Sequence, residues 1–208
     1  PGLPLAIINP ERRFTLLDRL ATTVFTRSVN LHYALHREGI AADRVQCIGS
    51  LFGCVAQATR EVVPDAAEVL RRFGLAPASL DVNRPFGLMT LSADPRWPLA
   101  KRLDALLVHL KGRLPLLWLV DRATADAVKA AALDKRLERQ GVTVLPMVGL
   151  LDSLAMLSRT ALLIGDESLR LAEEAVALDV PYLELAGDGA NAEQLVLAVD
   201  DVLSVASG

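Results

Sequence analysis

The chain has 208 residues, of which 52% are hydrophobic and 23% charged, so it carries enough apolar material for a packed core. Its formal net charge of −3 and its few aromatic residues argue against a nucleic-acid partner, and no apolar run is long enough to predict a membrane span. Two cysteines, Cys47 and Cys54, form neither a disulfide framework nor a metal-binding spacing. We expect both to be buried small side chains in a cytoplasmic protein without a metal or cofactor.

The first 84 residues predict a thin layer of short strands and helices. Apolar runs and helical patterns predict strands at 5–8, 24–26 and 44–48, and helices at 13–21, 30–38, 52–62 and 65–73. Three strands have little capacity to cover two faces of a sheet. We therefore expect an open edge and an exposed apolar face, which favour self-association as a homodimer.

From Phe86 onward, short apolar runs alternate with helical patterns. The predicted strands are 86–91, 114–120, 142–145, 161–164 and 182–185, and the predicted helices are 98–111, 124–140, 151–158, 168–178 and 192–206. Strands separated by helices pair in parallel through right-handed crossovers. The sequence thus predicts an α/β fold with a Rossmann-like, doubly wound parallel sheet. We divide the chain into a partial N-terminal α/β segment, 1–50, and a C-terminal Rossmann-like domain of the nucleotide-binding type, 51–208.

Several segments, in order along the chain, resemble the non-hydrolysing UDP-N-acetylglucosamine 2-epimerases. They include Pro10-Glu11, Phe25 to Ser28, Glu38-Gly39, Met89 to Ala93, Glu167 to Ala175 and Leu178 to Pro181. The 167–175 segment stands where that family has Asp-Ser-Gly-Gly-Ile-Gln-Glu-Glu-Ala. The resemblance implies the glycosyltransferase-B architecture, which has two Rossmann-like domains, and this chain corresponds to the second domain and part of the first.

The resemblance also implies a site for UDP or a UDP-sugar in the second domain. Ser168 matches a serine that meets a phosphate, Glu174 matches a glutamate that accepts ribose hydroxyls, and Glu193 is the last Glu of a further family segment. Arg170 replaces a glycine of the phosphate turn and could pair with a phosphate. A helix N-terminus after a strand offers free N–H groups to an anion, which supports this placement. The alternatives are a plain N-cap for Ser168 and solvated surface side chains for Arg170 and Glu174.

Residues for catalysis are scarcer. Glu11 is the one carboxylate that aligns with a family catalytic acid, and its alternative interpretation is a helix start after Pro10. Epimerisation at C2 needs an acid and a base on opposite faces of the sugar. The family's His-Arg pair falls at Ser92 and Ala93, and a second His falls at Asp121.

We therefore predict a UDP-sugar-binding protein that resembles the enzymes interconverting UDP-GlcNAc and UDP-ManNAc for surface polysaccharide synthesis, with impaired or absent catalysis. Two alternatives stay open. One is a non-catalytic, epimerase-like binding or assembly module. The other is part of a glycosyltransferase of the same architecture, in which a C-domain glutamate holds the donor ribose and fewer acid–base groups are needed.

Overall fold

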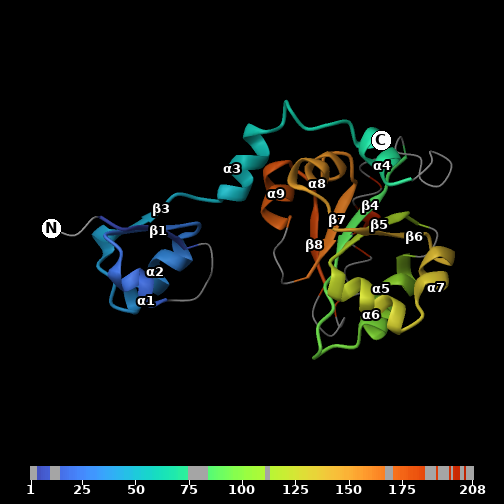
Figure 1. The fold of residues 1–208 in the computed structure, drawn as a ribbon, viewed down its shortest axis with the longest axis horizontal. Coiled ribbons are helices and arrows are strands. Elements are labelled where there is room, and N and C mark those ends of the chain that lie inside the picture. Colours follow the sequence, from blue (N-terminus) through green and yellow to red (C-terminus); the bar gives the residue numbers. More distant parts are fainter. Residues whose placement is uncertain are drawn as a thin grey trace. The chain divides into compact units, whose positions relative to one another are not determined.

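The structure is a computed structural model that describes residues 4–9, 15–74, 84–110, 113–166 and 171–185, with 191, 197, 199–201 and 204 near the carboxyl terminus. The chain forms two compact units, Pro1–Val55 and Ala56–Gly208 (Figure 1). The boundary that we propose from the sequence, after Ser50, lies at the start of helix α3 (Leu51–Ala58). Among the described residues, no helix has both the length and the apolar character needed to cross a membrane.

The first unit contains a three-stranded parallel sheet in the order β1-β2-β3. Its elements are β1 (Ala6–Asn9), α1 (Leu16–Leu20), β2 (Thr23–Thr26), α2 (Val29–Arg37), the 3-10 turn η1 (Ala42–Arg44) and β3 (Val45–Cys47). Helix α2 begins after Ser28, whose side chain accepts a hydrogen bond from the Leu31 N–H at 3.2 Å and so caps the helix. A small core joins the sheet to α2; its buried members are Ala21, Val24, Leu31, Leu35, Ile40 and Val45.

The expectation that both cysteines are buried is wrong, because each lies on an uncovered face. In β3 only Val45 is buried, and Cys47 is exposed. In α3 the buried positions are Gly53 and Ala56, so Cys54 also faces outward. The sequence pattern gave the strand and the helix correctly but not the number of faces that are covered.

The second unit contains a five-stranded parallel sheet in the order β6-β5-β4-β7-β8. The strands are β4 (Gly87–Thr90), β5 (Leu116–Val120), β6 (Val142–Pro146), β7 (Leu162–Gly165) and β8 (Tyr182–Glu184). The helices are α4 (Ala66–Arg72), α5 (Leu99–Leu110), α6 (Arg122–Ala130), α7 (Asp134–Arg139), α8 (Leu150–Leu157) and α9 (Ala172–Ala177). The chain adds β5 and β6 on one side of β4, then β7 and β8 on the other, so the predicted doubly wound α/β fold is confirmed.

Helices cover both faces of this sheet (Figure 1). One face packs with α5, α6 and α7, and the other with α4, α8 and α9. Every residue of β5 is buried, as expected for a central parallel strand. Trp118 points to the α5 face, fully buried, and its Nε1–H donates to the Leu91 carbonyl at 3.1 Å. The five-stranded sheet is therefore tightly packed on both faces.

The single helix predicted at 124–140 is two helices. Helix α6 ends at Ala130, Ala132 adopts a left-handed φ of 50°, and α7 begins at Asp134. This turn places Leu133 in the core, where it is 7% exposed. Helix α6 also begins earlier than predicted, because the Asp121 side chain accepts from the Thr124 N–H at 2.7 Å and caps it.

Candidate functional site

The edge where β4 and β7 end is the candidate binding edge of the second unit. In an open parallel sheet, ligands bind at the carboxyl ends of the strands, at the point where the strand order reverses. Here that point lies between β4, which leads into Leu91 and Ser92, and β7, which leads into Asp166. The side chains that follow these two strands therefore define the site.

A buried ion pair ties these two strand ends together. Asp166 accepts a hydrogen bond from the Ser92 N–H at 2.8 Å. Arg102, on α5, is 2% exposed; its Nη1 donates to the Ser92 carbonyl at 2.8 Å, and its Nη2 lies 3.4 Å from the same Asp166 oxygen. Because a buried charge needs a partner, Arg102 and Asp166 hold each other in place and fix the loop after β4 between them.

The next amide of that loop is held by helix α6, which follows the neighbouring strand β5. The Ala93 N–H donates to the Thr124 hydroxyl at 2.9 Å, and Thr124 is 1% exposed at the start of α6. Asp121, directly after β5, is committed to capping the same helix. The backbone amides of Ser92 and Ala93 are thus both used within the protein.

Further along the loop, Asp94 and Arg96 form a close pair. Arg96 approaches both carboxylate oxygens, with Nη2 to Oδ2 at 2.6 Å, and its backbone N–H donates to Oδ1 at 2.8 Å. The side-chain hydrogen bond from Arg96, followed by the backbone one, lowers the pKa of Asp94 to about 2. Asp94 is therefore an ionised, partnered carboxylate at neutral pH and not a general acid.

Tyr182, the first residue of β8, lies beside the end of β7. Its hydroxyl donates to the Asp166 carbonyl at 3.2 Å. Burial, together with the charges of Glu184 and Asp166, raises the pKa of Tyr182 to about 12. The ring lies against Gly165, where an added Cβ would come within 2.9 Å of Tyr182 Cε2. Tyr182 is therefore a neutral hydrogen-bond donor that braces the end of β7.

Of the five predicted site residues, Glu174 is the one that lies in the described part of the chain. It is 6% exposed on α9, the helix that follows β7, so its alternative interpretation as a solvated surface carboxylate is wrong. Glu11, Ser168, Arg170 and Glu193 lie outside the described residues.

Sequence reasoning missed Arg102, although the pattern held a signal for it. Arg102 lies three residues after Leu99 and four before Leu106, on the apolar stripe of α5. A charged residue at such a position predicts a buried partner. Its partner, Asp166, is 64 residues away in sequence, and the helical pattern gives no information about it.

The described residues bring together no group of three or more His, Cys, Asp or Glu side chains suited to a metal ion. The described polar side chains at this edge form hydrogen bonds and ion pairs: Arg102 with Asp166, Arg96 with Asp94, the Thr124 hydroxyl with the Ala93 N–H, and the Tyr182 hydroxyl with the Asp166 carbonyl.

The fold and its strand-order reversal define a Rossmann-like α/β protein of the glycosyltransferase-B type. Solved structures with this fold include the UDP-GlcNAc 2-epimerase of Methanocaldococcus jannaschii in complex with UDP-GlcNAc and UDP. It is 20% identical, with a TM-score of 0.71 over 90% of this chain and 56% of that one. The UDP-N-acetylglucosamine 2-epimerase of Rickettsia bellii is 16% identical, with a TM-score of 0.73 over 95% of this chain and 59% of that one.

The Anabaena protein HepE in complex with UDP-glucose is also similar, with 13% identity and a TM-score of 0.58 over 98% of this chain and 64% of that one. This chain thus spans about three fifths of the length of these proteins. No family model and no curated protein matches its sequence. The resemblance to UDP-N-acetylglucosamine 2-epimerases is confirmed at the level of the fold.

Proposed function

We propose that the second unit binds UDP or a UDP-sugar at the carboxyl ends of β4 and β7. Support comes from the fold, which solved proteins in complex with UDP-GlcNAc, UDP and UDP-glucose share. Further support comes from Glu174, which is buried on the helix that follows β7, where a carboxylate can reach a ribose.

The Arg102–Asp166 pair is the observation that carries this proposal. Asp166 directly precedes the segment that resembles a phosphate turn, and an uncompensated carboxylate there would repel a diphosphate. Arg102 offsets this charge from the buried side. The pair also holds Ser92 beside the end of β7, so the edge is preorganised before a ligand arrives.

Epimerase catalysis is impaired or absent in this proposal. Three described carboxylates that follow β4, β5 and β7 have internal partners: Asp94 pairs with Arg96, Asp121 caps α6, and Asp166 pairs with Arg102. Ser92 and Ala93, which stand where the family has His and Arg, offer neither an acid nor a base. A C2 proton at this edge therefore meets no described group that is ready to remove it.

Isothermal titration with UDP tests the binding site. We expect the unsubstituted chain to bind UDP and Glu174→Gln, which keeps the side-chain shape, to bind about tenfold more weakly, because a neutral amide is a poorer acceptor for ribose hydroxyls. Glu173→Gln, on the neighbouring residue, is the matched control and should bind UDP like the unsubstituted chain. Equal affinities for all three proteins would remove Glu174 from the site, and no heat at millimolar UDP would overturn the proposal.

Proton exchange tests catalysis separately. The chain is incubated with UDP-GlcNAc in heavy water, and the C2 proton is followed by NMR. We expect no deuterium at C2 and no UDP-ManNAc. Exchange at a rate above that of buffer would show an active epimerase and would contradict the impaired-catalysis part of the proposal.

We also propose a cytoplasmic homodimer that associates through the first unit. Leu16, Leu17 and Leu20 on α1 are 70%, 58% and 67% exposed, an apolar set that a monomer would leave in water. Light scattering after size exclusion should give twice the chain mass of 22.4 kDa. Leu16→Glu with Leu20→Glu should give the single mass, whereas a monomer before substitution would contradict this interface.

A further inference from the structure

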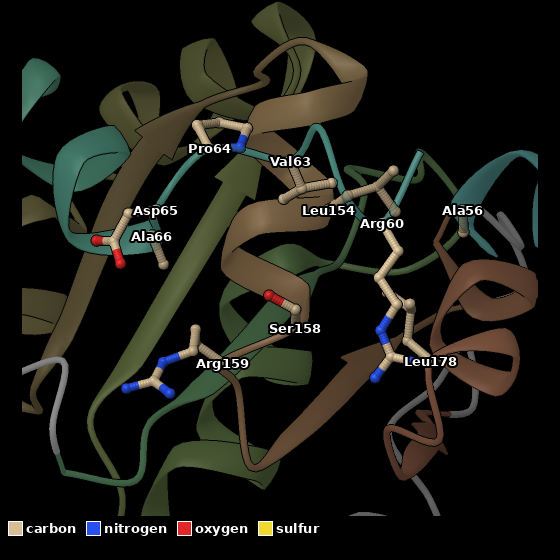
Figure 2. A pocket seen from close by; sticks show the side chains of 10 residues that line it. All are labelled: Ala56, Arg60, Val63, Pro64, Asp65, Ala66, Leu154, Ser158, Arg159 and Leu178. Carbon is tan, nitrogen blue, oxygen red and sulfur yellow. The ribbon is translucent and has the colours of Figure 1, made fainter. Parts of the chain in front are cut away.

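The second unit has a separate pocket at the edge of the sheet opposite to the proposed UDP site. It has a volume of about 260 Å³ and is lined by Ala56, Arg60, Val63, Pro64, Asp65, Ala66, Leu154, Ser158, Arg159 and Leu178 (Figure 2). Ser158 and Arg159 follow α8 and precede β7, and Leu178 follows α9 and precedes β8. The pocket therefore lies beside the amino ends of the strands, away from the edge proposed for UDP.

Two helices that contribute to the pocket lining, α4 and α8, are also joined by an ion pair at their other ends. Arg72, at the end of α4, donates to Asp152 in the first turn of α8 at 2.5 Å. The start of α4, at Asp65 and Ala66, lines the same pocket as Ser158 at the end of α8, so the two helices run antiparallel. The pocket is the space left where these two helix ends meet the segment that leads from α3.

The pocket floor is apolar, and its rim is cationic. Val63, Leu154 and Leu178 supply apolar surface, while the Arg60 and Arg159 side chains lie on either side of Ser158 in the close-up view (Figure 2). Among the described residues, neither guanidinium has a hydrogen bond or an ion pair. An arginine with five free donors beside apolar surface is suited to a carboxylate or a similar anion.

Asp65 does not neutralise both arginines. Its carboxylate caps α4, accepting from the Ala67 N–H at 2.7 Å and the Glu68 N–H at 3.3 Å. With two arginines and one carboxylate in the lining, the pocket has a formal charge of +1. A monoanion balances this charge.

We propose that this pocket binds a small organic monoanion with an apolar body, such as an aryl or alkyl carboxylate. An apolar cavity of about 150 Å³ holds benzene, so this pocket has room for roughly ten non-hydrogen atoms. The apolar part lies on Val63, Leu154 and Leu178, and the carboxylate lies at the rim that carries Arg60 and Arg159. The proposal does not depend on UDP binding, because the two sites lie at opposite edges of the sheet.

Phenylacetate is the probe, and 2-phenylethanol, which has the same ring without the charge, is the matched neutral compound. Each is titrated into the full chain labelled with 15N, and the amide shifts are followed by NMR. We expect phenylacetate to shift the amides of Ala66, Ser158 and Arg159, and to bind at least fivefold more tightly than 2-phenylethanol. Saturating UDP should leave this affinity unchanged.

The double variant Arg60→Gln with Arg159→Gln should bind phenylacetate about tenfold more weakly, since each exposed charge contributes a factor of a few. Both side chains are exposed, so the fold should persist. Arg139→Gln, which changes an exposed arginine on α7 outside the pocket, should bind like the unsubstituted chain. The proposal is overturned by unchanged affinity in the double variant, by equal binding of 2-phenylethanol, by equal weakening in Arg139→Gln, or by shifts confined to other residues.

Discussion

The two units are built from the same kind of parallel strands and helices, yet they differ in how many sheet faces are covered. In β5, of the second unit, all five residues are buried. In β3, of the first unit, one residue of three is buried. A parallel sheet is normally covered on both faces, so the first unit departs from the rule that the second obeys.

The difference lies in the cores. Among the described residues, the second unit packs two separate clusters, one on each face of its sheet, whereas the first unit has one small cluster between its sheet and α2. A unit with so little buried surface has a small stability margin. The comparison shows that the same local pattern can give a self-sufficient domain or a segment that requires cover, depending on what surrounds it.

The largest expected effect is from truncating a core leucine in each unit. Leu88→Ala, in β4, should lower the free energy of unfolding of the second unit by about 3–5 kcal/mol, because its neighbours on both sides are fixed. Leu35→Ala, in α2, removes the same atoms from the first unit and should cost about 2 kcal/mol, because a one-sided core can relax into the space.

Urea unfolding followed by two signals separates these effects. Both tryptophans, Trp97 and Trp118, lie in the second unit, so their fluorescence reports that unit, while far-ultraviolet circular dichroism reports both. Leu88→Ala should shift the fluorescence transition, and Leu35→Ala should shift only part of the dichroism. An equal shift of both signals by Leu35→Ala would show that the units unfold together and would contradict separate stabilities for the two units.

A smaller loss is expected from breaking the ion pair at the strand ends. Arg102→Met removes the buried guanidinium beside Asp166 and should cost about 3 kcal/mol, since a carboxylate that is only 12% exposed is destabilised when a buried cation next to it is lost. Adding Asp166→Asn to this variant removes the charge and should recover part of the loss. If the double variant is less stable than Arg102→Met, the electrostatic explanation is wrong.

The sequence predicted the strands and most helices of both units, because the spacing and number of apolar residues within a segment depend on that segment alone. It did not predict the exposed Cys47, because exposure depends on which elements cover a face. It joined α6 and α7, because nothing local marks Ala132 as left-handed. At the site, the helix that carries Glu174 was correctly expected after β7, but the Arg102–Asp166 contact joins residues that are distant in sequence. Local patterns therefore locate the edge, and tertiary packing decides which groups meet there.

Gly165→Ala should have an intermediate effect. The new Cβ would lie 2.9 Å from Tyr182 Cε2 and 3.3 Å from the Thr90 hydroxyl, so the ring must shift and stability should fall by about 1–3 kcal/mol. Gly149→Ala is the matched control, because nothing lies within 4 Å of a Cβ there. Thermal unfolding of both variants measures the difference. Equal melting temperatures would show that Tyr182 yields without cost and does not brace β7.

The smallest effect is the pH dependence that Tyr182 gives to the second unit. Its pKa is about 12 in the folded protein and 10.0 ordinarily, so between these values the folded state holds a proton that the unfolded state releases. The stability that this contributes is fully present below pH 10 and is lost as the pH rises toward 12. Tyr182→Phe should therefore show a shallower fall in stability over this range, measured by urea unfolding with tryptophan fluorescence. Tyr33→Phe, at an exposed tyrosine of the first unit, is the control, and the stability of the second unit should fall with pH in this variant as in the unsubstituted chain. If stability falls equally steeply in Tyr182→Phe, the Tyr182 hydroxyl is not the cause of the pH dependence.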